Sequence, residues 1–81
     1  MNLDQAIRTR INELIKENNT NLTNLCLNSN LTPSTMFDFM YGKTKSPKAI
    51  TIKKICAGAN ITLAEFYNKE YFNDMSEVFE S

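Results

Sequence analysis

With 81 residues, of which 42% are hydrophobic and 22% charged, the chain has the size and composition of one small globular domain. No apolar stretch approaches the roughly 20 residues of a membrane span, so we expect no membrane contact and a cytoplasmic location. The sequence has no histidine, no Gly-rich phosphate loop and no zinc-type cysteine spacing, so we expect no enzyme activity, no cofactor and no metal site.

The first predicted helix covers residues 3–17. Its apolar residues recur at helical spacing and form one stripe: Leu3, Ile7, Ile11, Leu14 and Ile15. Asp4 and Arg8 stand in the order that favours an ion pair, which we expect on the outer face. Asn18 and Asn19 end the helix, because asparagine tolerates left-handed backbone geometry.

A second helix and a tight turn follow. The side chain of Asn21 can cap this helix, and its buried side carries three apolar residues: Leu22, Leu25 and Cys26. In the turn, Asn30 is the expected left-handed residue and Leu31 is expected to be buried.

The third helix begins with Thr32 as its N-cap and Pro33 as its first residue, and Gly42 stops it. The helical spacing divides it into two faces. The inward face carries Met36, Phe39 and Met40. The outward face mixes hydroxyl, aromatic and carboxylate groups, namely Ser34, Phe37, Asp38 and Tyr41, with Thr35 at its edge.

A lysine-rich loop, "KTKSP", separates the third helix from two further helices. The fourth covers about residues 48–59, ends at Asn60 and buries one stripe: Ala49, Ile52, Ile55, Cys56 and Ala59. Thr62 caps a short fifth helix that buries Leu63 and Phe66, with Tyr67 as a further candidate. No run alternates as a strand would, so the expected class is all-α. Both cysteines lie in apolar helical patterns, so we expect buried, reduced thiols.

Residues 68–81 form an acidic aromatic tail. Four of its residues fit one helical stripe, namely Tyr71, Met75, Val78 and Phe79, and Phe72 can join Phe79. Two interpretations are equally open for this segment: it folds back onto the domain, or it forms a contact between the subunits of a dimer.

The formal net charge is zero, but the charges are unevenly distributed. Residues 19–64 contain five lysines and Asp38 as their single acid, which gives this part a net charge of +4. Residues 65–81 contain five acids and Lys69, a net charge of −4. Because salt screens exposed charges beyond about 8–10 Å, the local field decides what the basic part attracts. An anionic partner is therefore compatible with the neutral total.

The sequence predicts two helices joined by a short turn, the second of them ended by Gly-Lys, and this pattern is typical of a known protein family. From Ile11 to Phe66 the chain resembles the lambda-repressor-like Cro/CI-type (XRE) helix-turn-helix family, through the segments "NLTNLC", "NLTPSTMFDF" and "YGKTKSPKAITIKKICAGANITLAEF". The resemblance implies a compact five-helix bundle in residues 1–67. It also implies a homodimer that binds double-stranded DNA and regulates transcription as a repressor. Many members pair an arginine of the first helix with a glutamate late in the third, where this chain has Ile15 and Met40.

The resemblance also assigns the contacts with DNA. It places the third helix in the major groove, with base readers at Pro33, Ser34, Thr35 and Asp38 and with Phe37 beside them. Ser34 and Thr35 can donate or accept, Asp38 can accept from a cytosine amino group, and Phe37 can contact a thymine methyl. Contacts with the DNA backbone are assigned to Tyr41, Lys43, Thr44, Lys45 and Lys48.

Three alternatives stay open at this stage. The lysine run can be an ordinary solvated loop, and Phe37 and Tyr41 can pack against another protein or against the tail. The chain can also be an antitoxin or adaptor that holds a protein partner through the acidic tail. Finally, a helix-turn-helix scaffold can lose DNA binding and serve assembly alone.

Overall fold

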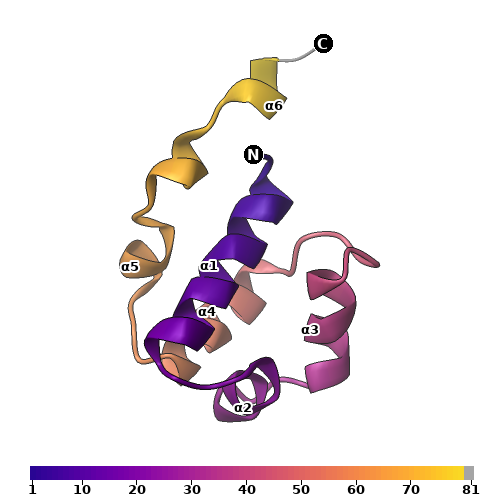
Figure 1. Ribbon diagram of the computed structural model, residues 1–81, viewed down its shortest axis with the longest axis vertical. Coiled ribbons are helices and arrows are strands. Elements are labelled where there is room, and N and C mark those ends of the chain that lie inside the picture. Colours follow the sequence, from indigo (N-terminus) through magenta and orange to yellow (C-terminus); the bar gives the residue numbers. More distant parts are fainter. Residues whose placement is uncertain (80–81) are drawn as a thin grey trace.

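Helices make up all the regular structure in residues 1–79, the part of the chain that the computed structural model describes. The order is α1 (Leu3–Glu17), α2 (Leu22–Asn28), α3 (Pro33–Met40), α4 (Ala49–Gly58), α5 (Leu63–Tyr67), a 3₁₀ helix η1 (Glu70–Asn73) and α6 (Ser76–Phe79). The all-α class and the five predicted helices are confirmed, and η1 and α6 are added in the tail (Figure 1). Within this part of the chain, no helix is both long and apolar enough to cross a membrane.

Asparagines and threonines set the helix ends, largely as predicted. Asn21 accepts a hydrogen bond from the Asn24 amide at 2.8 Å, and Thr62 forms a capping box with Glu65. Left-handed geometry occurs at Asn19, Asn30 and Asn60, with φ of 49°, 55° and 59°. Gly42 follows α3 with φ of 80° and confirms the predicted stop. Thr32 occupies the N-cap position of α3, but its side chain makes no capping hydrogen bond.

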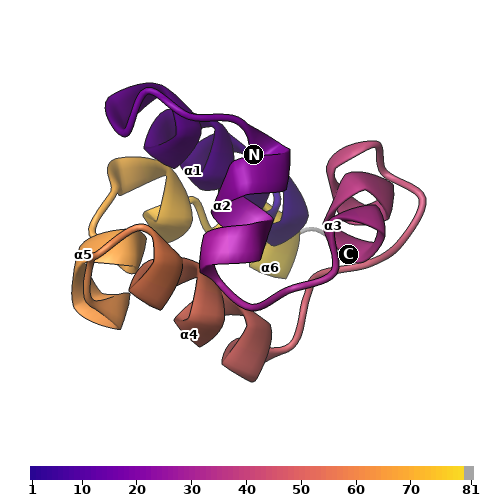
Figure 2. The same cartoon turned by 90° about the horizontal axis from the view of Figure 1, so that it is seen from below.

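One core lies where α1, α2, α3, α4 and α5 meet. It contains most residues of the predicted stripes, and its buried members include Ile11, Leu14, Met36, Phe39, Ile52, Ile55 and Phe66. Leu3, which the predicted α1 stripe included, is 47% exposed and lies outside the core. Leu31 and Met40 are half-buried against it. Seen from below, α3 stands at one edge of the bundle, with α4 and α5 on the other side of α2 (Figure 2).

Three further residues predicted to be buried are exposed. Ala49 is the first residue of α4 and lies on the solvent side. Leu63 and Tyr67, at the two ends of α5, are each 41% exposed, because the five residues of α5 direct Phe66 alone into the core. The α4 stripe therefore begins at Ile52, and α5 is anchored by one side chain.

Two arginines of α1 point into the bundle. The predicted ion pair between Asp4 and Arg8 is wrong, because Arg8 donates from Nε to the Phe39 carbonyl oxygen at 2.9 Å and lies 4.7 Å from the centre of the Phe39 ring. Arg8 thus joins α1 to the end of α3, a contact that the sequence analysis did not predict. Arg10 is 4% exposed and donates to the carbonyl oxygens of Phe66 and Glu65 at 2.8 and 3.1 Å. It adds a donor at the C-terminal end of α5, where the Glu65 carbonyl also accepts from the Asn68 amide at 3.4 Å.

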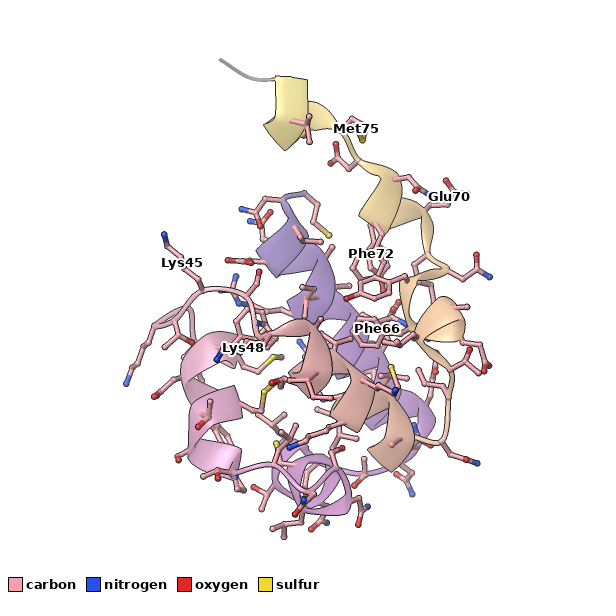
Figure 3. All side chains as sticks on the ribbon, turned by 180° about the vertical axis from the view of Figure 1, so that it is seen from behind. Lys45, Lys48, Phe66, Glu70, Phe72 and Met75 are labelled. Carbon is pink, nitrogen blue, oxygen red and sulfur yellow. The ribbon has the colours of Figure 1, made fainter. Side chains whose placement is uncertain are left out.

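The first half of the tail folds back onto the bundle. The Phe72 ring lies 5.9 Å from the Phe66 ring and 5.0 Å from the Tyr67 ring, measured between centroids. Figure 3 shows Phe72 pointing toward Phe66, while Met75 lies farther out along the tail. The Tyr71 hydroxyl donates to the Glu13 carboxylate on α1. Burial and this hydrogen bond raise the pKa of Tyr71 above its ordinary value.

The single helical stripe predicted for the tail is wrong. Tyr71 belongs to η1, Met75 lies between η1 and α6, and Val78 is in α6, so no continuous helix joins them. Phe72 packs on Phe66, and the predicted contact between Phe72 and Phe79 lies outside the described side chains. At the break, the Asp74 carboxylate contacts the terminal ammonium of Met1 and accepts a hydrogen bond from the Ser76 amide at the start of α6.

The two cysteines are buried and unpaired, as predicted. Burial raises the pKa of both thiols above its ordinary value, which keeps them protonated and weakly nucleophilic. Cys26 and Cys56 therefore act as small apolar core residues.

Candidate nucleic-acid interface

The inner face of α3 holds this helix at a fixed rotation. Met36 and Phe39 are 1% and 2% exposed, and Arg8 fastens the last turn through the Phe39 carbonyl. At the other end, Pro33 is the first helical residue and has no amide hydrogen to lose. The sequence-derived orientation of α3 is confirmed, because its apolar side is covered and its opposite side faces solvent.

The opposite side of α3 forms an exposed strip, which we define as Ser34, Thr35, Phe37, Asp38 and Tyr41. Ser34, Thr35 and Asp38 are exposed, Phe37 is half-buried, and Tyr41 is 73% exposed. The Phe37 and Tyr41 rings stack with their centroids 6.0 Å apart and an interplanar angle of 25°. Pro33, the remaining predicted base reader, is half-buried at the N-terminal end. Among the described residues, neither α5 nor η1 covers the strip, since both lie on the far side from α3 (Figures 1 and 2).

The predicted backbone-contacting residues lie directly beside this strip. Lys43, Thr44, Lys45 and Lys48 are all exposed in the segment between α3 and α4. This segment and the two helices enclose an open cleft of about 290 Å³, lined by Thr35, Met36, Phe39, Thr44, Lys45, Ser46, Pro47, Lys48 and Thr51. Lys45 and Lys48 extend from the same side of the molecule, away from Glu70 and Met75 (Figure 3). A ridge with three hydroxyls and one carboxylate thus stands next to a cluster of ammonium groups.

The start of α4 adds hydrogen-bond donors that the sequence did not reveal. Lys48 occupies the N-cap position without a capping hydrogen bond from its side chain. Within residues 1–79, the Ala49 and Ile50 amides accordingly have no acceptor. They directly follow Lys48, which lines the cleft together with Ser46 and Thr51. The sequence feature that could have indicated these donors is the alternation of hydroxyl residues with lysines immediately before a helix.

This arrangement suits a linear polyanion better than a small anion. The ammonium groups and free amides can bind oxygens of successive phosphates, as helix N-termini commonly do. The strip beside them offers hydroxyl donors and acceptors, the Asp38 acceptor and an aromatic surface, which are groups that contact base edges. The cleft is open and largely apolar at its base, so it does not enclose a ligand.

Comparisons with protein-family models, with curated proteins and with solved structures found no match to this chain. The function is therefore inferred from the residues of the chain and from their geometry.

Proposed function

We propose that this protein binds double-stranded DNA sequence-specifically and regulates transcription, with α3 inserted in the major groove. The observation that carries the proposal is the exposed strip of α3, turned outward by buried Met36 and Phe39 and flanked by three exposed lysines. In a helix-turn-helix, the second helix presents its outer face to base edges, while neighbouring residues contact phosphates. Ser34, Thr35, Phe37 and Asp38 are the proposed readers.

The fold we propose is the lambda-repressor-like bundle that the sequence resembles. Support comes from the order of α1–α5 and from the short turn, residues 29–32, between α2 and α3. Asn30 takes the left-handed position in this turn, with φ of 55°. The Arg8 contact with Phe39 fixes α3 against α1. Such an attachment keeps the reading helix rigid, which a base-specific contact requires.

We further propose that the protein acts as a homodimer and represses by occupying its site. An α3 of eight residues can reach few base pairs, so one subunit provides little discrimination. Two subunits reading half-sites about 34 Å apart on one face of the duplex multiply this discrimination. A two-fold dimer then requires a palindromic site.

The test is to select binding sites from a pool of random duplex DNA with the full chain at low salt. The expected result is an enriched, palindromic sequence whose complex is retarded on a native gel. A chain that retards no duplex at high protein concentration overturns the proposal. If every sequence is retarded to the same extent, the proposal of DNA binding stands and the proposal of sequence specificity fails.

One observation favours a second candidate function, an antitoxin or adaptor that binds a protein through the tail. Met75 and Val78 are 48% and 63% exposed in an acidic segment, outside the part that packs on the bundle. Replacing both by serine should abolish association with such a partner and leave DNA retardation intact. Loss of DNA binding in the same variant would instead assign these residues to the DNA-binding dimer.

A further inference from the structure

The strip of α3 is poorly equipped to recognise guanine. In the major groove, guanine presents the O6 and N7 acceptors, which bidentate Arg or Lys donors usually recognise. Residues 33–40 contain no Arg, Lys, Asn or Gln. Asp38 is the charged group of this helix, and its carboxylate accepts but does not donate. Asp38 therefore favours an amino group, such as N4 of cytosine or N6 of adenine, and repels the guanine acceptors.

The apolar part of the strip is a paired aromatic surface. The Phe37 and Tyr41 rings are one helical turn apart, with their centroids separated by 6.0 Å and their planes by 25°. Phe37 is half-buried on the outer side of α3, a helix whose rotation is fixed by the buried side chains of Met36 and Phe39. Tyr41 is 73% exposed and extends this surface outward. The stack thus presents a fixed apolar area on the side of α3 that faces away from the bundle.

From these features we infer that the stacked pair of Phe37 and Tyr41 reads the 5-methyl groups of thymine, so that the preferred half-site is thymine-rich. This inference rests on the proposed DNA binding and deepens it. The thymine methyl is the apolar group that base pairs display in the major groove, and apolar side chains contact it there. Lys43, Lys45 and Lys48 bind phosphates of any sequence, so they supply affinity without selecting a base.

The stack also changes the role of Tyr41. The sequence assigned its hydroxyl to a phosphate, whereas the structure joins its ring to Phe37 on the reading face. The two roles predict different effects of substitutions at Tyr41. Tyr41→Phe keeps the ring and removes the hydroxyl, so a methyl-reading role leaves the preference for thymine unchanged. Tyr41→Ala removes both groups and should weaken this preference.

The experiment changes the DNA and leaves the protein intact. Each thymine of the selected site is replaced in turn by deoxyuridine, which keeps the hydrogen-bonding edge and lacks the methyl. The dissociation constant of the full chain should rise about fourfold for each methyl that the stack buries. Replacement at flanking thymines outside the half-site serves as the matched control and should change nothing. In the same series measured with the Tyr41→Ala variant, replacing thymine by deoxyuridine should raise the dissociation constant less than it does for the parent protein.

The outcomes separate this inference from the proposed function. A chain that binds its selected site equally well with thymine and deoxyuridine at every position overturns the inference and leaves DNA binding standing. A selected half-site without thymine does the same. A chain that binds no duplex overturns both. If Tyr41→Ala then abolishes a complex with a second protein, the stack belongs to a protein interface.

Discussion

Gly58 marks the closest approach of α4 to the end of α2. A Cβ atom at this position would lie 2.9 Å from the Ser29 amide nitrogen and 3.0 Å from Ser29 Cα, distances that require the backbone to move. The Ser29 Oγ atom is in the way as well; it is buried and has no hydrogen-bond partner among the described residues. Because Gly58 has no side chain, Ser29 at the end of α2 can pack directly against α4.

Gly58→Ala is expected to destabilise the protein, although alanine is the better helix former. The gain in helix propensity is about 1 kcal/mol, whereas forcing a methyl group into a packed contact costs about 1–3 kcal/mol. We expect a net loss of up to about 2 kcal/mol, measured by urea denaturation. Ser29→Ala is the control and should be neutral or slightly stabilising, because it removes a buried hydroxyl without a partner. An increase in stability with Gly58→Ala would contradict the close packing.

At the scale of single residues, the sequence was informative where the signal is local. Asn19, Asn30 and Asn60 were predicted because a helix end needs left-handed geometry, and their φ angles agree. Arg10 was missed because its burial depends on carbonyl oxygens more than fifty residues away in α5. Its spacing from Ile7 and Leu14 did place it on the buried stripe of α1, but charge alone suggested solvent.

Among the elements, the tail departs most from its sequence pattern. A helical periodicity over residues 71–79 was visible, yet Phe72 packs on Phe66 and no continuous helix forms. The competing interactions are tertiary: the aromatic contacts with α5 and the hydrogen bond from Tyr71 to Glu13. By contrast, α3 was predicted in bounds and orientation, since its cap, its stop and its apolar face all indicate the same helix.

Tyr71→Phe tests how η1 is attached to α1. The variant loses the hydrogen bond to Glu13 and should be about 1 kcal/mol less stable at pH 7. Because the folded state raises the pKa of Tyr71, its stabilising effect is complete below the ordinary pKa of 10.0 and is lost as the pH rises above it. The stability difference between the parent protein and the variant should therefore shrink above pH 10.

Urea denaturation at neutral and alkaline pH provides the measurement. The buried thiols of Cys26 and Cys56, whose pKa values are also raised, are present in both proteins and cancel in the comparison. Tyr41→Phe on the exposed strip is the control and should leave stability unchanged. A difference between the parent and Tyr71→Phe that grows with pH would show that the phenol is not held in its protonated form.

The strip and the lysine segment should contribute differently to DNA binding. Lys43→Ala with Lys45→Ala should weaken binding to all sequences equally, because phosphates carry no sequence information. Ser34→Ala or Asp38→Ala should instead alter the preference at particular base pairs by about 1–3 kcal/mol. Lys53→Ala with Lys54→Ala is the charge-matched control, since these exposed lysines lie within α4 and not in the segment beside the strip. Similar effects of the lysine and strip variants would refute the assignment of α3 to the groove.

Across the whole molecule, the zero net charge results from two separated regions. Lys45 and Lys48, between α3 and α4, lie on one side of the molecule, whereas Glu70 in the tail lies on the opposite side (Figure 3). At physiological salt, charges farther apart than about 8 Å barely interact. Glu70 therefore does little to offset the charge of Lys45 and Lys48, and the local charge beside the strip matters more than the neutral total.

The salt dependence of DNA affinity should report this local charge and the number of subunits together. If Lys43, Lys45 and Lys48 each neutralise one phosphate, the plot of log K against log salt should have a slope of about −3 for one subunit and about −5 for two. The affinity for the selected site is measured between about 50 and 200 mM salt, the range in which counterion release dominates. Lys43→Ala with Lys45→Ala should reduce the slope by about 2 per bound subunit. A slope near zero would mean that the lysines do not reach phosphates, and it would leave the strip without the charge that holds it against a duplex.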